Sequence, residues 1–408
     1  MILNNALDIL VFFAIFTVVT TLLNVYTRGK QLTLHRLRLQ FIVGGVLLFI
    51  GKKRTPHFSR PIDRKFHILF VIVTLLGIIL FYSVFVPEIV KFVKSFLEYA
   101  TGTSSIAPQP VMVPVPLLFK FQDIVPYLFI AIGIAVIVHE FMHAFIAIME
   151  GVSIKSWGIG LMFFMPLAFV ELDENSFNNS SRRSKINIVS AGIFGNAITT
   201  LIIFLILLTI NTLTPMIIGI PSTTVAITSI NCSICNTSLC PARVANLKPN
   251  TIIVAINNIS IDSINKFVSV VQELPIGSNI SIDICDYNGF CESLNIYLNA
   301  HKKDSETIPC IGAVFDSATV FIKNGKLYRL PWFENLVFLL TTILVINFSL
   351  FVVNAIPLFI TDGALFLKYS IDQSSKFSKI VSMKIIDILN ALIIIVATSL
   401  SSYILLSG

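Results

Sequence analysis

Two histidines and a glutamate within five residues are the part of this sequence best suited to chemistry. They are His139, Glu140 and His143, in the segment Val-His-Glu-Phe-Met-His-Ala. With six histidines and ten glutamates in 408 residues, chance would produce this spacing on the order of 0.002 times. Residues four apart share one face of a helix, so both imidazoles can bind one Zn²⁺ while Glu140 lies beside a water held there. The alternative is a structural pair that hydrogen-bonds to neighbouring helices.

A zinc site that performs catalysis needs a third protein ligand and an open position for water. Asp362 is the best candidate, because Pro357 and Gly363 let the preceding apolar run unwind and direct a carboxylate inward. The segment reads Asn354-Ala-Ile-Pro-Leu-Phe-Ile-Thr-Asp-Gly363. The remaining histidines, at positions 35, 57, 67 and 301, lie in or beside a basic loop or far along the chain. The alternative for Asp362 is an ordinary carboxylate at a membrane interface.

The overall composition places these groups in a membrane protein. Hydrophobic residues make up 55% of the chain and charged residues only 12%, and the mean hydropathy is +0.86. That charge density is about half the value typical of soluble domains, which excludes a soluble globular protein. The net charge of +7 does not indicate nucleic-acid binding, because the basic residues follow the loops between apolar runs.

Apolar runs long enough to cross a lipid bilayer, about 20 residues each, occur in six places. They are residues 7–26, 66–86, 125–149, 186–210, 336–356 and 385–406. Two shorter apolar runs, residues 41–50 and 158–170, contain glycine and are interpreted as re-entrant or interfacial segments. The sequence therefore predicts a polytopic α-helical membrane protein with about six transmembrane helices and a re-entrant segment.

Lysine and arginine in short loops indicate the orientation of such a protein. The loop of residues 27–65 carries ten of them against one acid, Asp63, so we expect it on the cytoplasmic side. Alternation then puts both termini and residues 211–335 outside. His139 lies 14 residues after Val125, about 21 Å into a core of about 30 Å. The metal site is therefore expected nearer the cytoplasm.

All six cysteines fall in the long segment expected outside. Their positions are 232, 235, 240, 285, 291 and 310. This clustering favours disulfides in an oxidising compartment, although six cysteines allow 15 pairings. A metal or redox site built on Cys232-x-x-Cys235 with Cys240 is the alternative.

The same segment changes from continuous apolar residues to short alternating strands. The pattern predicts an α+β domain with a helix at residues 264–274 and strands at residues 225–230, 252–256, 280–285 and 291–297. Residues 241–258 resemble the PDZ domains of membrane-associated proteases, with Asn250 and Asn258 where that family has glycine. A PDZ fold accepts a strand at an open sheet edge, so both a substrate-reading role and a spacer role are compatible with it.

Four motifs in order resemble the site-2 protease family of intramembrane zinc metalloproteases, in its branch with an outer PDZ-like domain. They are His139-Glu-x-x-His143, Gly158–Glu171 around Pro166, Ala191-Gly-Ile-Phe-Gly-Asn196, and the set Asn354, Pro357 and Asp362-Gly363. Three positions depart from the family pattern, since Met142, Leu167 and Thr361 stand where Gly, Gly and Leu are usual. None of the three is a metal ligand, although Met142 is expected to narrow the space near the zinc.

The resemblance implies a role for each matched residue. It implies that His139, His143 and Asp362 hold zinc, that Glu140 is the general base and then the proton donor, and that Asn196 and Asn354 position the substrate or a zinc ligand. We also hypothesise that the stretch of residues 158–170, including Phe169, offers a strand edge that holds an extended substrate.

These patterns predict a zinc-dependent intramembrane endopeptidase that cuts transmembrane protein substrates in a lipid bilayer, most simply a prokaryotic plasma membrane. The expected divisions are two N-terminal spans with a basic loop (1–124), the first part of the catalytic core (125–210), the PDZ-like domain (211–330) and the second part of the core (331–408). The alternatives are a catalytically inactive scaffold or receptor of the same fold, and a membrane metalloprotease of the prenyl-peptide type. No pattern specifies an oligomeric state.

Overall fold

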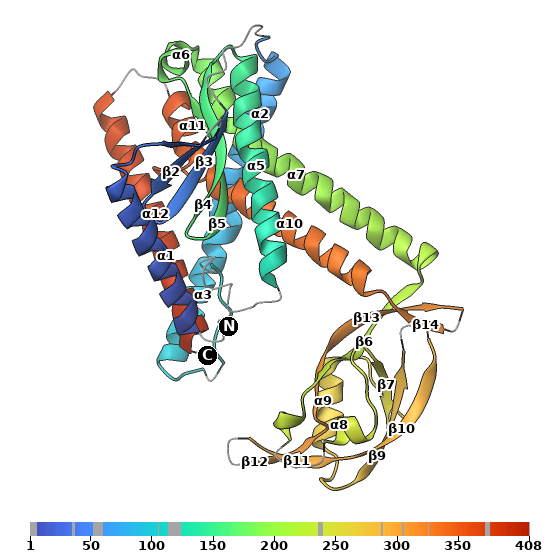
Figure 1. The fold of residues 1–408 in the computed structure, drawn as a ribbon. Coiled ribbons are helices and arrows are strands. Elements are labelled where there is room, and N and C mark those ends of the chain that lie inside the picture. Colours follow the sequence, from blue (N-terminus) through green and yellow to red (C-terminus); the bar gives the residue numbers. More distant parts are fainter. Residues whose placement is uncertain are drawn as a thin grey trace. The chain divides into compact units, whose positions relative to one another are not determined.

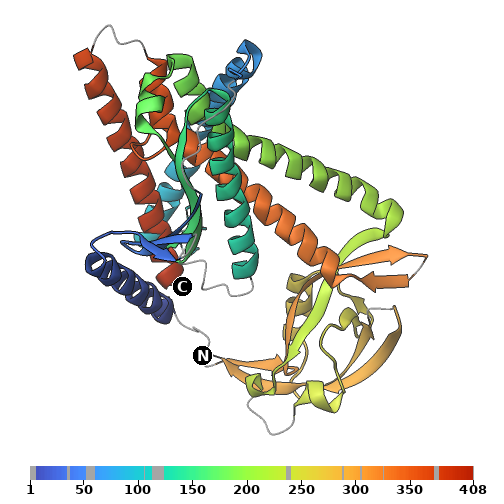
Figure 2. The same cartoon turned by 45° about the horizontal axis from the view of Figure 1, so that its top comes forward.

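The computed structural model of the chain describes residues 6–34, 37–51, 60–104, 106–112, 124–235, 240–286, 289–303, 306–324, 326–371 and 376–407. The chain forms two compact units, one of residues Met1–Phe204 with Leu339–Gly408 and one of residues Leu205–Phe338. The first unit holds most of the long apolar helices and a small sheet, and the second is an α+β domain (Figures 1 and 2).

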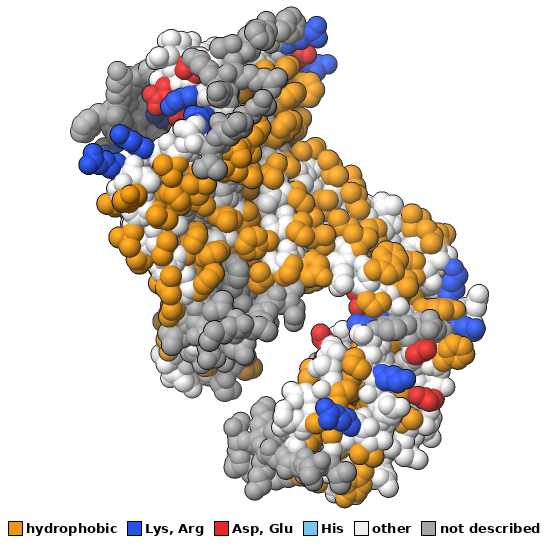
Figure 3. Space-filling model, viewed as in Figure 1, with side chains coloured by type: hydrophobic (Ala, Val, Ile, Leu, Met, Phe, Trp, Pro, Cys, Tyr) orange, Lys and Arg blue, Asp and Glu red, His pale blue; other side chains and the backbone are white. Residues whose placement is uncertain are grey.

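Five helices among the described residues are long and apolar enough to cross a membrane. They are Arg64–Ala100, α5 (Val125–Met149), α7 (Arg182–Ile217), α10 (Pro331–Ala355) and the part Lys384–Leu406 of α12 (Lys376–Ser407). These helices overlap the second to sixth predicted spans. The first predicted span is also helical, as α1 (Ala6–Tyr26), but its described apolar part, Val11–Tyr26, is shorter than the others. Apolar side chains cover much of the visible surface of these helices, and charged side chains gather at one end of the first unit (Figure 3).

The second predicted span is part of a longer, interrupted helix. It consists of α2 (Arg64–Leu80), a five-residue π-helix η1 (Phe81–Phe85) and α3 (Val86–Ala100). Pro87 has no backbone N–H, so the carbonyl of Ser83 loses its α-helical donor. The wider π turn lies directly before that proline, where such a loss is accommodated.

The two short apolar runs at residues 41–50 and 158–170, interpreted as re-entrant or interfacial segments, belong to one antiparallel sheet. The strand order is β1-β2-β3-β4-β5. The strands are β1 (Leu32–Leu34), β2 (Leu37–Ile42), β3 (Gly45–Gly51), β4 (Ile154–Met162) and β5 (Met165–Leu172). These runs carry apolar residues or glycine on both faces, so they lack the period of two by which half-buried strands are recognised.

The turn between β4 and β5 is held in an unusual conformation. Phe163 and Phe164 both have positive φ, at 48° and 62°, which costs a non-glycine residue about 1–2 kcal/mol. The N–H of Phe163 donates to the carbonyl of Gly44 at 2.7 Å. The ring of Phe164 packs on Phe12 and Phe16 of α1, with ring centroids 4.4 Å and 4.0 Å away. These contacts offset the strain and keep the end of β5 in place.

The second unit is a seven-stranded sheet with order β10-β9-β7-β6-β13-β14, in which β8 pairs with β7. Its strands are β6 (Ile220–Ile230), β7 (Ile252–Ile256), β8 (Ile259–Ser260), β9 (Asn279–Cys285), β10 (Cys291–Tyr297), β13 (Ala313–Lys323) and β14 (Lys326–Arg329). Two short helical turns, η3 (Cys232–Ile234) and α8 (Pro241–Val244), the helix α9 (Ile264–Gln272) and the hairpin of β11 (Asn299–Lys303) and β12 (Glu306–Cys310) complete it. The core is mainly aliphatic and includes the buried residues Ile253, Ile256, Phe267, Ile282 and Ile296.

The predicted strands and helix of this domain are confirmed. Asn250 (φ 70°) and Asn258 (φ 66°), which stand where PDZ domains have glycine, have left-handed backbone. Strand β13 was not predicted. A register shift between Val314 and Phe315 breaks its alternation, which removes the period-two signal.

All six cysteines form disulfides, as predicted. The pairs are Cys232–Cys240, Cys235–Cys310 and Cys285–Cys291. The sequence left these pairings open. The pair Cys235–Cys310 joins the segment after β6 to the end of β12, immediately before β13.

Opening the long disulfide should destabilise the second unit more than opening the short one. Cys235–Cys310 closes a separation of 75 residues and Cys285–Cys291 one of 6. The chain-entropy relation gives about 4.5 kcal/mol for the first loop and about 2 kcal/mol for the second. The loss of stability on opening each disulfide is measured by urea unfolding of the full chain with both cysteines of that pair replaced by serine, with unfolding monitored by limited proteolysis. Equal losses would contradict the assigned pairing.

Candidate active site

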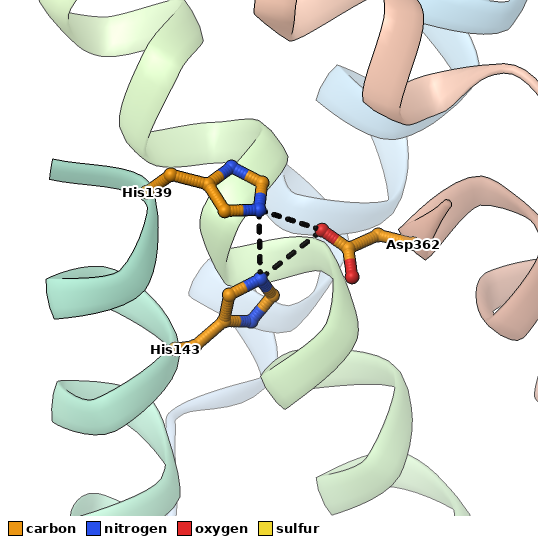
Figure 4. A group of neighbouring side chains, drawn as sticks. All are labelled: His139, His143 and Asp362. Atoms are coloured by element: carbon orange, nitrogen blue, oxygen red, sulfur yellow. Dashed lines mark hydrogen bonds and ion pairs between the residues drawn. The ribbon is translucent and has the colours of Figure 1, made fainter. Parts of the chain in front are cut away.

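Three side chains from distant parts of the sequence meet in the first unit. His139 and His143 lie one turn apart on α5, and Asp362 is the first residue of α11 (Asp362–Ser370). The two Nε2 atoms and Oδ2 of Asp362 form a triangle with all three sides 3.1 Å long. Figure 4 shows both imidazoles projecting from α5 toward the carboxylate. The structure thus brings together the three residues predicted as metal ligands.

This triangle fits a tetrahedral zinc ion. Bonds of about 2.0–2.1 Å to zinc put neighbouring ligand atoms of a tetrahedron about 3.3 Å apart, close to the 3.1 Å between these atoms. Two imidazoles and a carboxylate leave one position for water or substrate, as in catalytic zinc sites. The three side chains are only 12–16% exposed, so an ion bound there would be largely enclosed by protein.

Each imidazole has a second partner on α7 that orients it. His143 Nδ1 lies 2.7 Å from the carbonyl oxygen of Ile188, so Nδ1 donates and Nε2 is left to bind metal. His139 Nδ1 lies 3.2 Å from the amide nitrogen of Asn196. The Asn196 side chain is fully buried, and its Oδ1 has no hydrogen-bond partner within the described residues. Rotating the Asn196 side-chain amide by 180° exchanges its oxygen and nitrogen, so that Oδ1 accepts a hydrogen bond from Nδ1–H of His139.

A glycine on α7 makes room for both imidazoles. A Cβ added at Gly192 would overlap Nε2 of His143 and Cε1 of His139. In the sequence, Gly192 belongs to the motif Ala191-Gly-Ile-Phe-Gly-Asn196, but no role was predicted for it. One feature of the sequence could have indicated its importance. Glycine inside a helix lowers helix stability by about 1 kcal/mol relative to alanine, so its presence there indicates a packing or functional requirement.

Glu140 connects the metal-binding group to the small sheet. Its Oε2 accepts a hydrogen bond from the backbone N–H of Val170 at 3.0 Å. Val170 belongs to β5, which is an edge strand of the sheet. The catalytic candidate is therefore oriented by the edge of β5 that pairs with no other strand and along which α5 packs.

The direction of the Val170 N–H also defines which other backbone groups of β5 lie on the edge that pairs with no strand. Backbone direction alternates along an antiparallel strand, so Ala168 presents its N–H and carbonyl on the same side as Val170. Pro166, two residues earlier, has no N–H to present, which suits an edge position. Phe169 faces the other way along the backbone and pairs with Gly158 of β4.

The remaining predicted residues lie near the site without joining the metal-binding group. The ring of Phe169 packs against Phe49 of β3, with centroids 4.9 Å apart. Asn354 is half-buried in the last turn of α10, and its side chain makes no hydrogen bond among the described residues. His67 contacts Asn187 at 2.6 Å. His35 and His57 lie outside the described residues, as does the side chain of His301.

Met142, expected to narrow the space near the zinc, packs toward α7 instead. A Cβ added at Gly195 would meet its Cγ at 2.7 Å. Met142 also packs against an apolar cluster whose buried members include Phe70, Ile146 and Ile188. The departure from the family pattern at this position therefore fills a contact between two helices.

The apolar helices and the His-His-Asp group define an integral membrane protein with a metal-binding centre. Residues 127–400 match the model of Peptidase family M50, and the chain belongs to that family. The match contains all three metal-binding residues and Glu140. The matched family is a family of peptidases.

Two further comparisons cover smaller parts of the chain. The uncharacterized protein MJ0971 of Methanocaldococcus jannaschii is 41% identical over 93 residues, which are 22% of this chain and 24% of that protein. The PDZ domain of the SdrC-like protein Lmo2051 from Listeria monocytogenes is 21% identical, with 22% of this chain and 86% of that chain covered. Its TM-score is 0.19, which supports no conclusion about the fold.

The variant Gly192→Ala should bind zinc at least tenfold more weakly, because the added methyl group displaces both imidazoles. Gly133→Ala is a matched control on α5, since a Cβ there meets nothing within 4 Å. Zinc per chain in purified protein, measured against a graded series of chelator concentrations, compares the two. Wild-type zinc binding by Gly192→Ala would contradict the described packing.

Proposed function

We propose that this chain is a zinc-dependent endopeptidase that hydrolyses peptide bonds in or near transmembrane segments of other membrane proteins. The observation that carries the proposal is the group of His139, His143 and Asp362, two of whose members lie on a helix long and apolar enough to cross a membrane. Ionisable residues in such helices are costly and usually functional. Membership of a peptidase family supports the same reading.

Each residue of the site has a distinct task in this proposal. His139, His143 and Asp362 hold the zinc ion, which supplies Lewis acidity toward the scissile carbonyl and lowers the pKa of a water molecule. Glu140 accepts a proton from the attacking water at its carboxylate and delivers it to the leaving amine. The Val170 N–H holds Glu140 in place at 3.0 Å.

The asparagines support these groups. Asn196 orients His139 through Nδ1, as the Ile188 carbonyl orients His143. This contact favours a ligand-orienting role for Asn196 over direct substrate binding. Asn354, whose side chain makes no hydrogen bond among the described residues, contacts the substrate.

The substrate binds as an extended strand along β5. A transmembrane helix has all its backbone groups bonded internally, so it must unwind before a peptide carbonyl can be attacked. The outward N–H and carbonyl of Ala168 can pair with the unwound segment beside Glu140. Phe169 supports this edge through its contact with Phe49 rather than through its own amide.

The location follows from charge and disulfides. We assign the basic loop of residues 27–65 to the cytoplasmic side of a prokaryotic plasma membrane, and the second unit to the opposite side. Three disulfides within that unit support an oxidising compartment. Cleavage then releases a fragment to the cytoplasm, and the second unit acts as a PDZ-like domain.

Neither alternative function has a specific observation in its favour. An inactive scaffold predicts lost ligands, whereas the three ligands and Glu140 are present. A protease of the prenyl-peptide type uses a glutamate ligand from a later span, whereas the third member of this group is Asp362.

Glu140→Gln should lower cleavage of a detergent-solubilised membrane substrate by about 10²–10⁴-fold, because the amide cannot accept the proton. Zinc content should stay at the wild-type level, since Glu140 is not one of the three grouped ligands. Glu174→Gln, at an exposed glutamate that begins α6 (Glu174–Asn179), is the matched control. Full activity of Glu140→Gln would refute the assigned mechanism.

Ala168→Pro should raise KM at least several-fold, because proline removes one outward N–H of β5 while leaving the pairing with β4 intact. Ala168→Val keeps the N–H and adds bulk, so it separates loss of the hydrogen bond from crowding. Single-turnover cleavage of one substrate by both variants gives the comparison. Equal rates for the two would argue against strand pairing at this edge.

A further inference from the structure

The Asp362 carboxylate is carried by a short loop that is itself tightly closed. The loop, residues 356–361, joins α10 to α11, and Ile356, Pro357 and Leu358 are buried. The Thr361 hydroxyl donates to the carbonyl of Ile356 at 2.5 Å and accepts from the N–H of Leu358 at 3.2 Å. Asp362 directly follows this closed loop, so its position depends on how the loop is anchored.

Gly363 gives the loop little freedom on its other side. A Cβ added there would overlap the carbonyl group of Ala355, in the last turn of α10. Asp362 therefore lies between a closed loop and a close backbone contact. A shift of the loop must move the carboxylate relative to His139 and His143.

One buried side chain from α12 anchors the loop. Asn390 is 1% exposed and donates from Nδ2 to the carbonyl of Pro357 at 2.8 Å. Pro357 is buried, and a buried carbonyl without a donor is costly. Asn390 thus satisfies a backbone group five residues before the metal ligand.

The orientation of Asn390 is in turn determined by a residue of the interrupted helix α2–η1–α3. The Tyr82 hydroxyl donates to Oδ1 of Asn390 at 2.9 Å. With Oδ1 taken by this donor, Nδ2 is left to face Pro357. Tyr82 lies in the π-helix η1, a type of turn often found at functional sites.

The same stretch of helix packs against the base of the loop. Phe81 is 1% exposed and lies in one apolar cluster with Phe351 and Ile356. A Cβ added at Gly77 would overlap the Cβ of Ala355. Residues 64–100 lie before the segment that matches the peptidase family, 127–400, yet they support the loop that carries Asp362.

We propose that Tyr82 and Asn390 are positioning residues that hold the Asp362 carboxylate in place for metal binding, through the hydrogen bonds Tyr82–Asn390–Pro357. The interrupted helix α2–η1–α3 then contributes to the metal site and is more than an additional membrane anchor. This inference rests on the metal site of the proposed function.

The test uses Tyr82→Phe, which removes one hydroxyl from a side chain that is 41% exposed and so should not prevent folding. We expect zinc release into excess chelator to be roughly five-fold faster, as for loss of one hydrogen bond. We also expect a changed visible absorption of Co²⁺ bound in place of zinc, because that absorption reports ligand geometry. The thermal unfolding midpoint should stay at the wild-type value.

Two further variants test whether the effect arises from the hydrogen bonds Tyr82–Asn390–Pro357 rather than from the loss of any tyrosine hydroxyl. Tyr403→Phe removes the hydroxyl of a tyrosine on α12 whose ring packs on Phe96 and whose hydroxyl makes no hydrogen bond among the described residues, so it should match wild type. Asn390→Ala should release zinc at least ten-fold faster. Adding Tyr82→Phe to Asn390→Ala should have no further effect, because both act through one chain of bonds.

Hydrogen exchange in the metal-free protein distinguishes this inference from the proposed function. Tyr82→Phe should speed exchange of the peptide covering residues 356–363 several-fold, because the loop opens more readily. Absence of zinc from the wild-type protein would defeat the proposed function and the metal-holding role together, while the exchange result would still decide whether Tyr82 anchors the loop. Wild-type zinc release, Co²⁺ absorption and exchange in Tyr82→Phe would overturn the inference.

Discussion

Two imidazole nitrogens and a carboxylate oxygen lie 3.1 Å from one another in a largely apolar helical unit. Their lone pairs converge on one point, which is favourable only with a proton or a metal ion between them. Much of the first unit serves this convergence. Helix α5 supplies two groups from one turn, and α11 supplies the third from 219 residues further along the chain. Helix α7 passes behind them with glycine at 192, so the imidazoles can turn toward the carboxylate.

Small residues and buried amides position the metal-binding side chains. Charged groups would be costly in this role, because the surroundings are apolar. Gly192 and Gly363 let backbones approach the site closely. Asn196 and Asn390 bond an imidazole and a loop carbonyl without adding net charge. Each amide joins groups from separate helices, and so the site depends on the packing of the whole unit rather than on one motif.

The sequence was sufficient to predict those parts of the site and fold whose residues lie close together in the chain or follow a strong pattern. The spacing of His139 and His143 defines one helix face, and proline and glycine beside Asp362 mark an unwound segment. Apolar runs predicted six spans; five correspond to helices long enough to cross a membrane, and the first to the shorter apolar helix α1. Alternation predicted four strands and one helix of the second unit. Pairing of β3 with β4 was not predictable, because the paired residues 45–49 and 158–162 are apolar or glycine on both faces. The Tyr82–Asn390 bond spans 308 residues, and no spacing rule relates such positions.

The open side of β5 has a consequence for the choice of substrate. Its outward backbone groups at Ala168 can be satisfied by any extended chain, whatever its side chains. A regular helix has no free backbone groups to offer in exchange. Under the proposed function, such an edge would select substrates by backbone conformation before side-chain identity. The fraction of time that a membrane segment spends unwound, raised by glycine or proline within it, would then determine how readily it is cut.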